Sequence, residues 1–168
     1  ESDQAALVKS ARELFEPALN ELKDHRAREG AELKQLIAER LSSISDRTAI
    51  LREMMPTLLS AHRQKLIDRF NEAKLELDST RVEQEIVMLA QKIDVAEELD
   101  RLDTHVTETH RVLASKDAIG RRLDFLMQEF NREANTLGSK AIDTRSTQAA
   151  VDLKVFIEQM REQIQNIE

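Results

Sequence analysis

Side chains that can perform chemistry recur with helical spacing between residues 97 and 105. Glu98, Arg101 and His105 are separated by three and four residues, so a carboxylate, a guanidinium and an imidazole share one stripe of a helix. Such a trio is typical of a metal-ligand or acid–base site. The alternative is a solvated ion-pair face, in which Glu97 and Arg101 form an ordinary pair four residues apart.

A second set of polar side chains lies between residues 120 and 140, opposite an apolar stripe. Asparagine is a poor choice for a solvated helix face, because its amide competes for backbone hydrogen bonds. Asparagines aligned with glutamine and aspartate therefore predict a buried polar network or a ligand site. The alternative is a polar seam between packed helices. The stripe consists of Asp124, Gln128, Asn131 and Asn135, flanked by Arg121, Glu129, Arg132 and Glu133.

The common catalytic signatures are missing from the chain. The sequence has no phosphate-binding glycine loop, no His-Glu-x-x-His motif, no nucleophile elbow and no calcium loop. It has no cysteine, which excludes thiolate metal sites and suits a reducing cytoplasm. Tyrosine and tryptophan are absent and phenylalanine occurs five times, so an aromatic platform for stacked bases is not expected.

Charge does not decide between nucleic-acid binding and other functions. The net charge of −7 argues against a polyanionic partner, but most of the acidity lies in residues 1–115, with 17 basic and 23 acidic side chains. Residues 116–168 carry 8 basic and 9 acidic side chains and are close to neutral. The longest apolar run, residues 86–90, is far too short to span a bilayer.

The elements that position these residues are predicted to be helices. Three glycines and two prolines, with 40% hydrophobic and 34% charged residues, favour an all-α fold of long antiparallel helices packed as a bundle or coiled-coil-like array. Apolar spacing predicts a first helix over 4–55, with a close helix crossing or a backbone approach at Gly30. Pro56 is expected to end that helix and to start a second one over 56–77.

Three more helices are expected towards the C-terminus. A capping-box pattern at Thr80–Glu83 predicts a helix over 80–113. A helix over 118–137 is expected to end at Gly138 in a left-handed cap. Asp143 or Thr144 can cap a last helix, whose apolar residues follow a coiled-coil-like spacing. Those apolar residues are Leu153, Ile157, Met160, Ile164 and Ile167.

Several of these segments together resemble one known family. The runs GRRLDFLMQEFNREANTLGSKA and LKVFIEQMREQIQNIE, with EELDRLDTH and RAREG upstream, are similar to the C-terminal signature of the YicC family of bacterial endoribonucleases. The resemblance covers essentially the whole chain, most densely over 97–168. It implies a cytoplasmic bacterial protein that forms a ring-like homo-oligomer, such as a hexamer, and cuts RNA with a divalent cation.

The resemblance also suggests roles for individual residues. Carboxylates would hold Mg²⁺ or Mn²⁺, and His105 would act as a general acid or base beside Glu129 and Glu133. Basic and amide side chains would hold RNA. Because the carboxylates of 121–140 lie on adjacent stripes, another helix or subunit must complete a metal site. The expected metal ligands are Glu98, Asp124, Glu129 and Glu133, and the expected RNA-binding residues are Arg101, Arg121, Arg122, Gln128, Arg132, Asn135 and Lys140.

The family carries an additional N-terminal α/β half to which nothing here corresponds. The chain is therefore expected to be the C-terminal portion of such a protein, with a long helical hairpin over 1–79 and the family's helical domain over 80–168. The competing hypothesis is a non-catalytic helical module for oligomerisation or partner binding, which long apolar seams and an acidic surface also fit.

Overall fold

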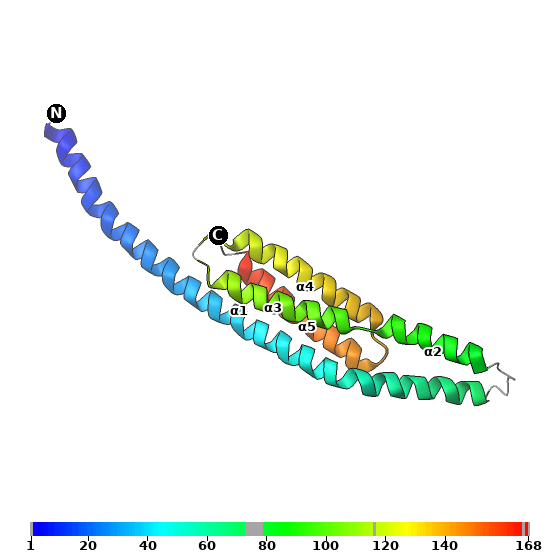
Figure 1. The fold of residues 1–168 in the computed structure, drawn as a ribbon. Helices are drawn as coiled ribbons and strands as arrows, with labels where there is room; N and C mark the ends of the chain where they lie inside the picture. The colour runs from blue at the N-terminus through cyan, green and yellow to red at the C-terminus, as the bar shows by residue number, and fades with distance from the viewer. Residues whose placement is uncertain (1, 73–78, 116, 166, 168) are drawn as a thin grey trace. The chain divides into compact units, whose positions relative to one another are not determined.

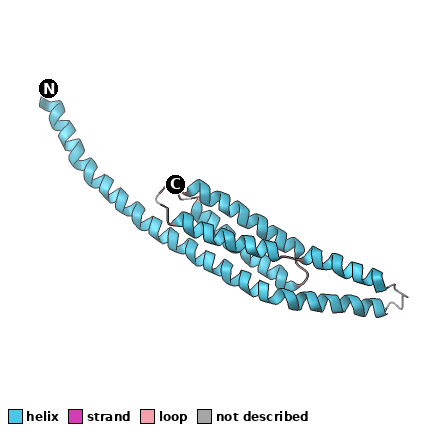
Figure 2. Cartoon of the chain, in the orientation of Figure 1, coloured by secondary structure: helices cyan, strands magenta, loops and turns pink. Residues whose placement is uncertain are grey.

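The protein is all-α in its computed structural model, which describes residues 2–72, 79–115, 117–165 and 167. The helices are α1 (Ser2–Glu72), α2 (Ser79–Ile93), α3 (Ala96–Leu113), α4 (Gly120–Lys140) and α5 (Thr144–Ile164), and no strand occurs in the described part (Figures 1 and 2). The predicted fold class is confirmed. The chain divides into two compact units, one up to Ile37 and one from Ala38 onward.

The expected helix break at Pro56 is wrong, because α1 continues through it to Glu72. Proline removes one backbone hydrogen bond and disfavours a helix interior by about 3 kcal/mol. Leu51 and Leu58 on either side of Pro56 are buried, at 2% and 3% exposure. Tertiary packing of this stretch therefore outweighs the local preference of proline, and the expected pair of helices within 1–79 is a single helix up to Glu72.

The close helix crossing or backbone approach expected at Gly30, in the first unit, stays a prediction. A β-carbon built at Gly30 would have no described atom within 4 Å outside the local helix. The side chains of residues 4–36 are almost all exposed, including those of Leu7, Leu14 and Leu22. Within the first unit, Gly30 therefore has open space beside it.

The helix expected over 80–113 is interrupted at Asp94 and Val95. The Asp94 carboxylate accepts a hydrogen bond from the Ala96 amide at 3.0 Å, and its backbone carbonyl accepts one from Lys140 Nζ at 2.7 Å. These bonds replace helical ones and separate α2 from α3. Periodicity could not show this break, because apolar residues keep their spacing across it. The side chains of the Thr80–Arg81–Val82 part of the predicted capping box lie outside the described residues.

Helices α3, α4 and α5 pack side by side in the second unit (Figure 1), and Leu41, Ile44 and Leu51 of α1 are buried in the same unit. Contacts between α3 and α4 run in opposite directions along the chain: Glu98 pairs with Lys140, and Glu108 with Arg122. These two helices are therefore antiparallel, as predicted. The core includes the large buried side chains of Leu102, Leu123, Phe130, Leu153 and Met160.

Of the two helix caps expected between α4 and α5, the one at the start of α5 is confirmed and the one at the end of α4 is wrong. Asp143 caps α5, as expected: its Oδ1 accepts from the Ser146 amide at 2.9 Å, and Ser146 Oγ accepts from the Asp143 amide. Gly138 does not form a left-handed cap, because α4 continues to Lys140. A β-carbon at Gly138 would lie 3.7 Å from Cβ of Ala150, so the glycine lies where α4 and α5 approach each other.

Two further predictions concern membranes and domains. Among the described residues, no helix combines the length and the apolar character needed to cross a bilayer. The predicted domain boundary between residues 79 and 80 falls at the start of α2 and stays a prediction.

Candidate functional site

Three of the predicted site residues converge between α3 and α4. His105 on α3 and Glu129 and Glu133 on α4 each offer a ligand atom, and these atoms all lie within 4.8 Å of one another. Among the described residues, this group has three metal-ligating side chains with ligand atoms close enough together to hold one ion. The spacing of four residues places both glutamates on one stripe of α4, and the antiparallel α3 supplies the imidazole.

His105 is held in place by packing. Leu102 and Val106 on its own helix are buried, and its ring meets the edge of Phe130 in a T-shaped contact with centroids 5.5 Å apart. Its Nε2 atom is buried and has no hydrogen-bond partner in the described structure. A buried imidazole nitrogen without a partner costs free energy unless it binds something. The His105 ring thus brings a buried polar atom without a protein partner to the α3–α4 contact.

Glu133 is a buried carboxylate with a nearby cation. The residue is 3% exposed, and its Oε1 accepts from Arg101 Nη1 at 3.4 Å. The same guanidinium also pairs with Glu97 on its own helix. The charge of Glu97, and then that of Glu133, raises the pKa of Arg101 above its usual value. The guanidinium thus bridges a solvent-exposed and a buried carboxylate.

Glu129 is the more accessible of the two α4 carboxylates. Its side chain is 17% exposed and pairs with Arg132 at 3.0 Å, one turn further along α4. Arg132 is mostly exposed. The candidate site therefore has two arginines beside it, and both have donors that reach solvent.

Glu98, a predicted metal ligand, lies outside the three-residue cluster. Its Oε1 accepts from Lys140 Nζ at 2.7 Å, and Lys140 also donates to the Asp94 carbonyl. This buried ion pair ties the end of α4 to the start of α3. Glu98 Oε2 is buried without a hydrogen-bond partner. Lys140, predicted to bind RNA, is thus engaged in a contact that holds the α2–α3 junction.

The predicted buried polar network on α4 is wrong for this chain. Asp124, Gln128, Asn131 and Asn135 are all exposed. They pair along their own helix: Gln128 donates to Asp124 at 3.0 Å and Asn135 to Asn131 at 3.4 Å. Nor do they form a seam between the described helices. A polar surface for a ligand remains a prediction, and Asp124 is not part of the metal-ligand cluster.

The remaining predicted RNA-binding residues lie near the start of α4. Arg122 pairs with Glu108 on α3, which also accepts from Arg111 at 2.9 Å. The hydrogen bond from Arg111, followed by that from Arg122, holds the pKa of Glu108 below its usual value, against the opposing effect of desolvation. Arg121 is exposed and lines, together with Asp124, an open hollow of about 760 Å³.

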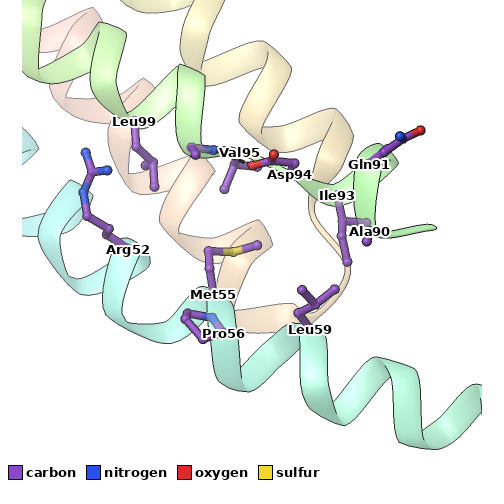
Figure 3. A pocket seen from close by; sticks show the side chains of 11 residues that line it. Arg52, Met55, Pro56, Leu59, Ala90, Gln91, Ile93, Asp94, Val95 and Leu99 are labelled. Carbon is purple, nitrogen blue, oxygen red and sulfur yellow. Dashed lines mark hydrogen bonds between the residues drawn. The ribbon is translucent and has the colours of Figure 1, made fainter. Parts of the chain in front are cut away.

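A cavity that the sequence did not reveal lies at the α2–α3 junction. It has a volume of about 420 Å³, and its walls come from α1 around Pro56 and from the interrupted segment around Asp94 (Figure 3). Met55, Leu59 and Leu99 make it mostly apolar. Its walls include the uninterrupted stretch of α1 and the residues at the break after Ile93, and neither feature was predicted.

Comparison with known proteins agrees with the resemblance of the sequence. Residues 50–168 match the family described as "Endoribonuclease YicC-like, C-terminal". The whole chain is 51% identical to the "Probable endoribonuclease YicC" of Haemophilus influenzae, and 34% identical to the protein of the same name from Clostridioides difficile. The chain spans 58% of the length of each relative. It therefore belongs to the YicC-like endoribonuclease family, in the part that the C-terminal domain of that family defines.

Proposed function

We propose that this chain is the helical part of a metal-dependent endoribonuclease and that His105, Glu129 and Glu133 hold its divalent cation. The observation that carries the proposal is the convergence of the three ligand atoms within 4.8 Å. The names of the relatives support RNA as the substrate. The buried and unpartnered His105 Nε2 supports metal binding over a purely structural role.

The donor set suits Mn²⁺ better than Mg²⁺. One imidazole nitrogen and two carboxylates are ligands that Mn²⁺ accepts readily, whereas Mg²⁺ prefers oxygen ligands alone. A bound cation would lower the pKa of a coordinated water and neutralise charge on a phosphodiester. As a metal ligand, His105 would orient the site rather than act as the general acid or base, so its proposed role differs from the one expected from the resemblance.

The surrounding side chains would position RNA. Arg101 and Arg132 lie beside the cluster, and their guanidinium groups can bind phosphate oxygens in a bidentate manner. On the exposed stripe of α4, Gln128 and Asn135 can donate to sugar or phosphate oxygens. Arg121 extends the same helix face towards its N-terminal end. We infer that the RNA runs along α4.

The test compares the full-length protein with the 168-residue chain on a structured RNA, with Mn²⁺ and with a chelator. We expect Mn²⁺-dependent cleavage that is lost in His105→Ala and Glu133→Gln. Glu162→Gln is the control, because it removes a carboxylate from an exposed position of α5. Absence of metal-dependent cleavage from both proteins contradicts the enzyme proposal. Unchanged cleavage in both site variants contradicts the assignment of the site.

A non-catalytic role in assembly is the second candidate, and the first unit gives it support. Residues 4–36 carry large apolar side chains that are more than half exposed: Leu7, Val8, Leu14, Phe15 and Leu22. Apolar surface of this kind favours contact with another chain. We propose that these residues contribute to a ring-like homo-oligomer, which is compatible with cleavage at the second unit. An oligomer that neither binds metal nor cleaves RNA would favour the non-catalytic function.

A further inference from the structure

Arg101 contacts two carboxylates in very different surroundings. The Glu97 side chain is 72% exposed, whereas that of Glu133 is 4% exposed. An exposed pair contributes little to stability, since water solvates both charges well. A buried carboxylate depends on a nearby positive charge, because burial removes its hydration. Water can solvate the Glu97 carboxylate but not the buried carboxylate of Glu133. The guanidinium of Arg101 therefore matters more for the charge of Glu133 than for that of Glu97.

The Arg101–Glu133 contact is not a strong one. Its N–O distance is 3.4 Å, longer than the roughly 2.7–2.9 Å of a good charge-assisted hydrogen bond. Arg101 itself is about half exposed and does not belong to the buried core. The same Glu133 carboxylate belongs to the cluster with His105 and Glu129. A divalent cation in that cluster would bind the negatively charged Glu133 carboxylate, which is now paired with the Arg101 guanidinium.

We propose that the Arg101 guanidinium and the divalent cation compete for the Glu133 carboxylate, and that the displaced guanidinium binds the substrate phosphate. The inference rests on the proposed metal site and adds a coupling between metal loading and RNA binding. Glu97 would keep Arg101 near the site after displacement. Because Arg101 and His105 are one helical turn apart on α3, the free guanidinium stays within reach of a phosphate at the cluster.

The first experiment measures Mn²⁺ affinity of the full-length protein by calorimetry or by the spin-resonance signal of free Mn²⁺. Arg101→Gln removes the competitor, so we expect Mn²⁺ to bind roughly threefold to tenfold more tightly. Arg111→Gln is the matched control: it removes the same charge from α3 about 15 Å further along, where it contacts Glu108. Equal Mn²⁺ affinity in wild type and Arg101→Gln would overturn the competition, as would an equal gain in Arg111→Gln.

The second experiment asks whether Glu97 acts through Arg101. Glu97→Gln removes the alternative acceptor, so the guanidinium should hold Glu133 more firmly and Mn²⁺ affinity should fall. In the Arg101→Gln background the same change should have a clearly smaller effect, because the guanidinium is gone. An effect of Glu97→Gln that is equal in both backgrounds would show that Glu97 acts only as a remote negative charge and would contradict its proposed part in the competition.

The third experiment measures binding of a non-cleavable RNA analogue at saturating Mn²⁺. Arg101→Gln should weaken RNA binding about tenfold, whereas Arg111→Gln should not. Tighter Mn²⁺ binding with unchanged RNA affinity would refute the phosphate role and retain the competition. If wild type binds no Mn²⁺, the proposed metal site itself fails. If wild type binds Mn²⁺ and Arg101→Gln does not differ from it, only this inference fails.

Discussion

At the residue scale, two glutamates that look alike in the sequence, Glu98 and Glu133, differ in the side chains that they contact. Glu98 and Glu133 are both buried glutamates among basic residues. Glu98 has a lysine ammonium at 2.7 Å, whereas Glu133 has a long contact with an arginine and lies beside an imidazole nitrogen. The first arrangement is that of a structural ion pair, whereas the second supports the ligand role that we propose for Glu133.

This difference can be tested with two matched substitutions. Glu133→Gln should raise the Kd for Mn²⁺ at least about tenfold, because a neutral amide is a poor ligand. Glu98→Gln should leave Mn²⁺ affinity unchanged and lower the free energy of unfolding by about 1–3 kcal/mol, because Lys140 loses a charged acceptor in a buried place. Mn²⁺ titration and urea unfolding measure the two effects. A large loss of Mn²⁺ affinity in Glu98→Gln would return Glu98 to the ligand set.

At the element scale, helix ends and interruptions decide how α3, α4 and α5 present the site. Lys140 at the end of α4 bonds the carbonyl at the α2–α3 break, so α4 is fixed where α3 begins. From that point α3 runs antiparallel to α4 and brings His105 level with Glu129 and Glu133. The capping box at Asp143 then starts α5, which packs on α4.

The Asp143 cap should make stability depend on pH. Desolvation favours a higher pKa, but hydrogen bonds from Ser146 and Arg145 outweigh it and keep the pKa of Asp143 below its usual value. A lowered folded-state pKa contributes stability that is present above the unfolded pKa of about 4 and is lost as pH falls through the folded pKa. Asp143→Asn keeps a capping side chain that does not titrate. Wild type should be more stable than Asp143→Asn at pH 7 in thermal melts.

That advantage should shrink below about pH 4, where the carboxylate becomes protonated. Asp143→Ala serves as the reference without a cap, and it should be about 1 kcal/mol less stable than wild type at pH 7. A gap between wild type and Asp143→Asn that stays constant down to pH 2 would contradict the role of the carboxylate charge.

The position of Gly138 inside α4 predicts that alanine there stabilises the protein, whereas alanine at a left-handed cap would destabilise it. Because Gly138 lies within α4 and a β-carbon there would make an ordinary 3.7 Å contact with Ala150, Gly138→Ala should stabilise the protein by about 0.5–1 kcal/mol. The gain comes from better helix propensity. Chemical unfolding measures it, and Gly30→Ala is the comparison in which no described neighbour is near. A marked loss of stability in Gly138→Ala would contradict the helical geometry.

At the scale of the whole molecule, the two units differ in how much apolar surface they bury. The second unit has a core of fully buried leucines, with Phe130 and Met160. In the first unit, Leu14 is 77% exposed and Phe15 is 63% exposed. A unit that leaves such side chains in water gains free energy by association, so the exposed face supports the proposed homo-oligomer.

Leu14→Glu should therefore weaken self-association, because it places a charge in the apolar face. We expect a shift towards smaller species in sedimentation velocity at equal concentration. Asn20→Glu is the matched control, since it adds the same charge at an exposed polar position of α1. If wild type is a monomer at every concentration tested, the oligomer proposal is wrong. If both variants dissociate equally, net charge rather than the apolar face controls association.

The sequence by itself determined the all-α class, the Asp143 cap and the family, because helical periodicity, capping chemistry and family signatures are local properties of the chain. It also placed His105, Glu129 and Glu133 among the candidate catalytic residues, but it gave His105 an acid–base role and counted Glu98 and Asp124 among the metal ligands. It could not decide that Pro56 lies inside a helix, that Asp94 interrupts one, or that the polar stripe of α4 is exposed. Those outcomes depend on burial and on contacts between residues far apart in the chain.

The candidate metal site shows the same division. Spacing placed Glu98 and His105 on one stripe and the α4 glutamates on another, but only the antiparallel packing of α3 on α4 assigned each carboxylate its partner. Glu98 lies outside the cluster and pairs with Lys140, whereas the partner of Glu133 is a half-exposed arginine. Opposite charges stabilise a buried carboxylate only at short range, so the tertiary structure, rather than the spacing in the sequence, assigned each glutamate its cationic partner.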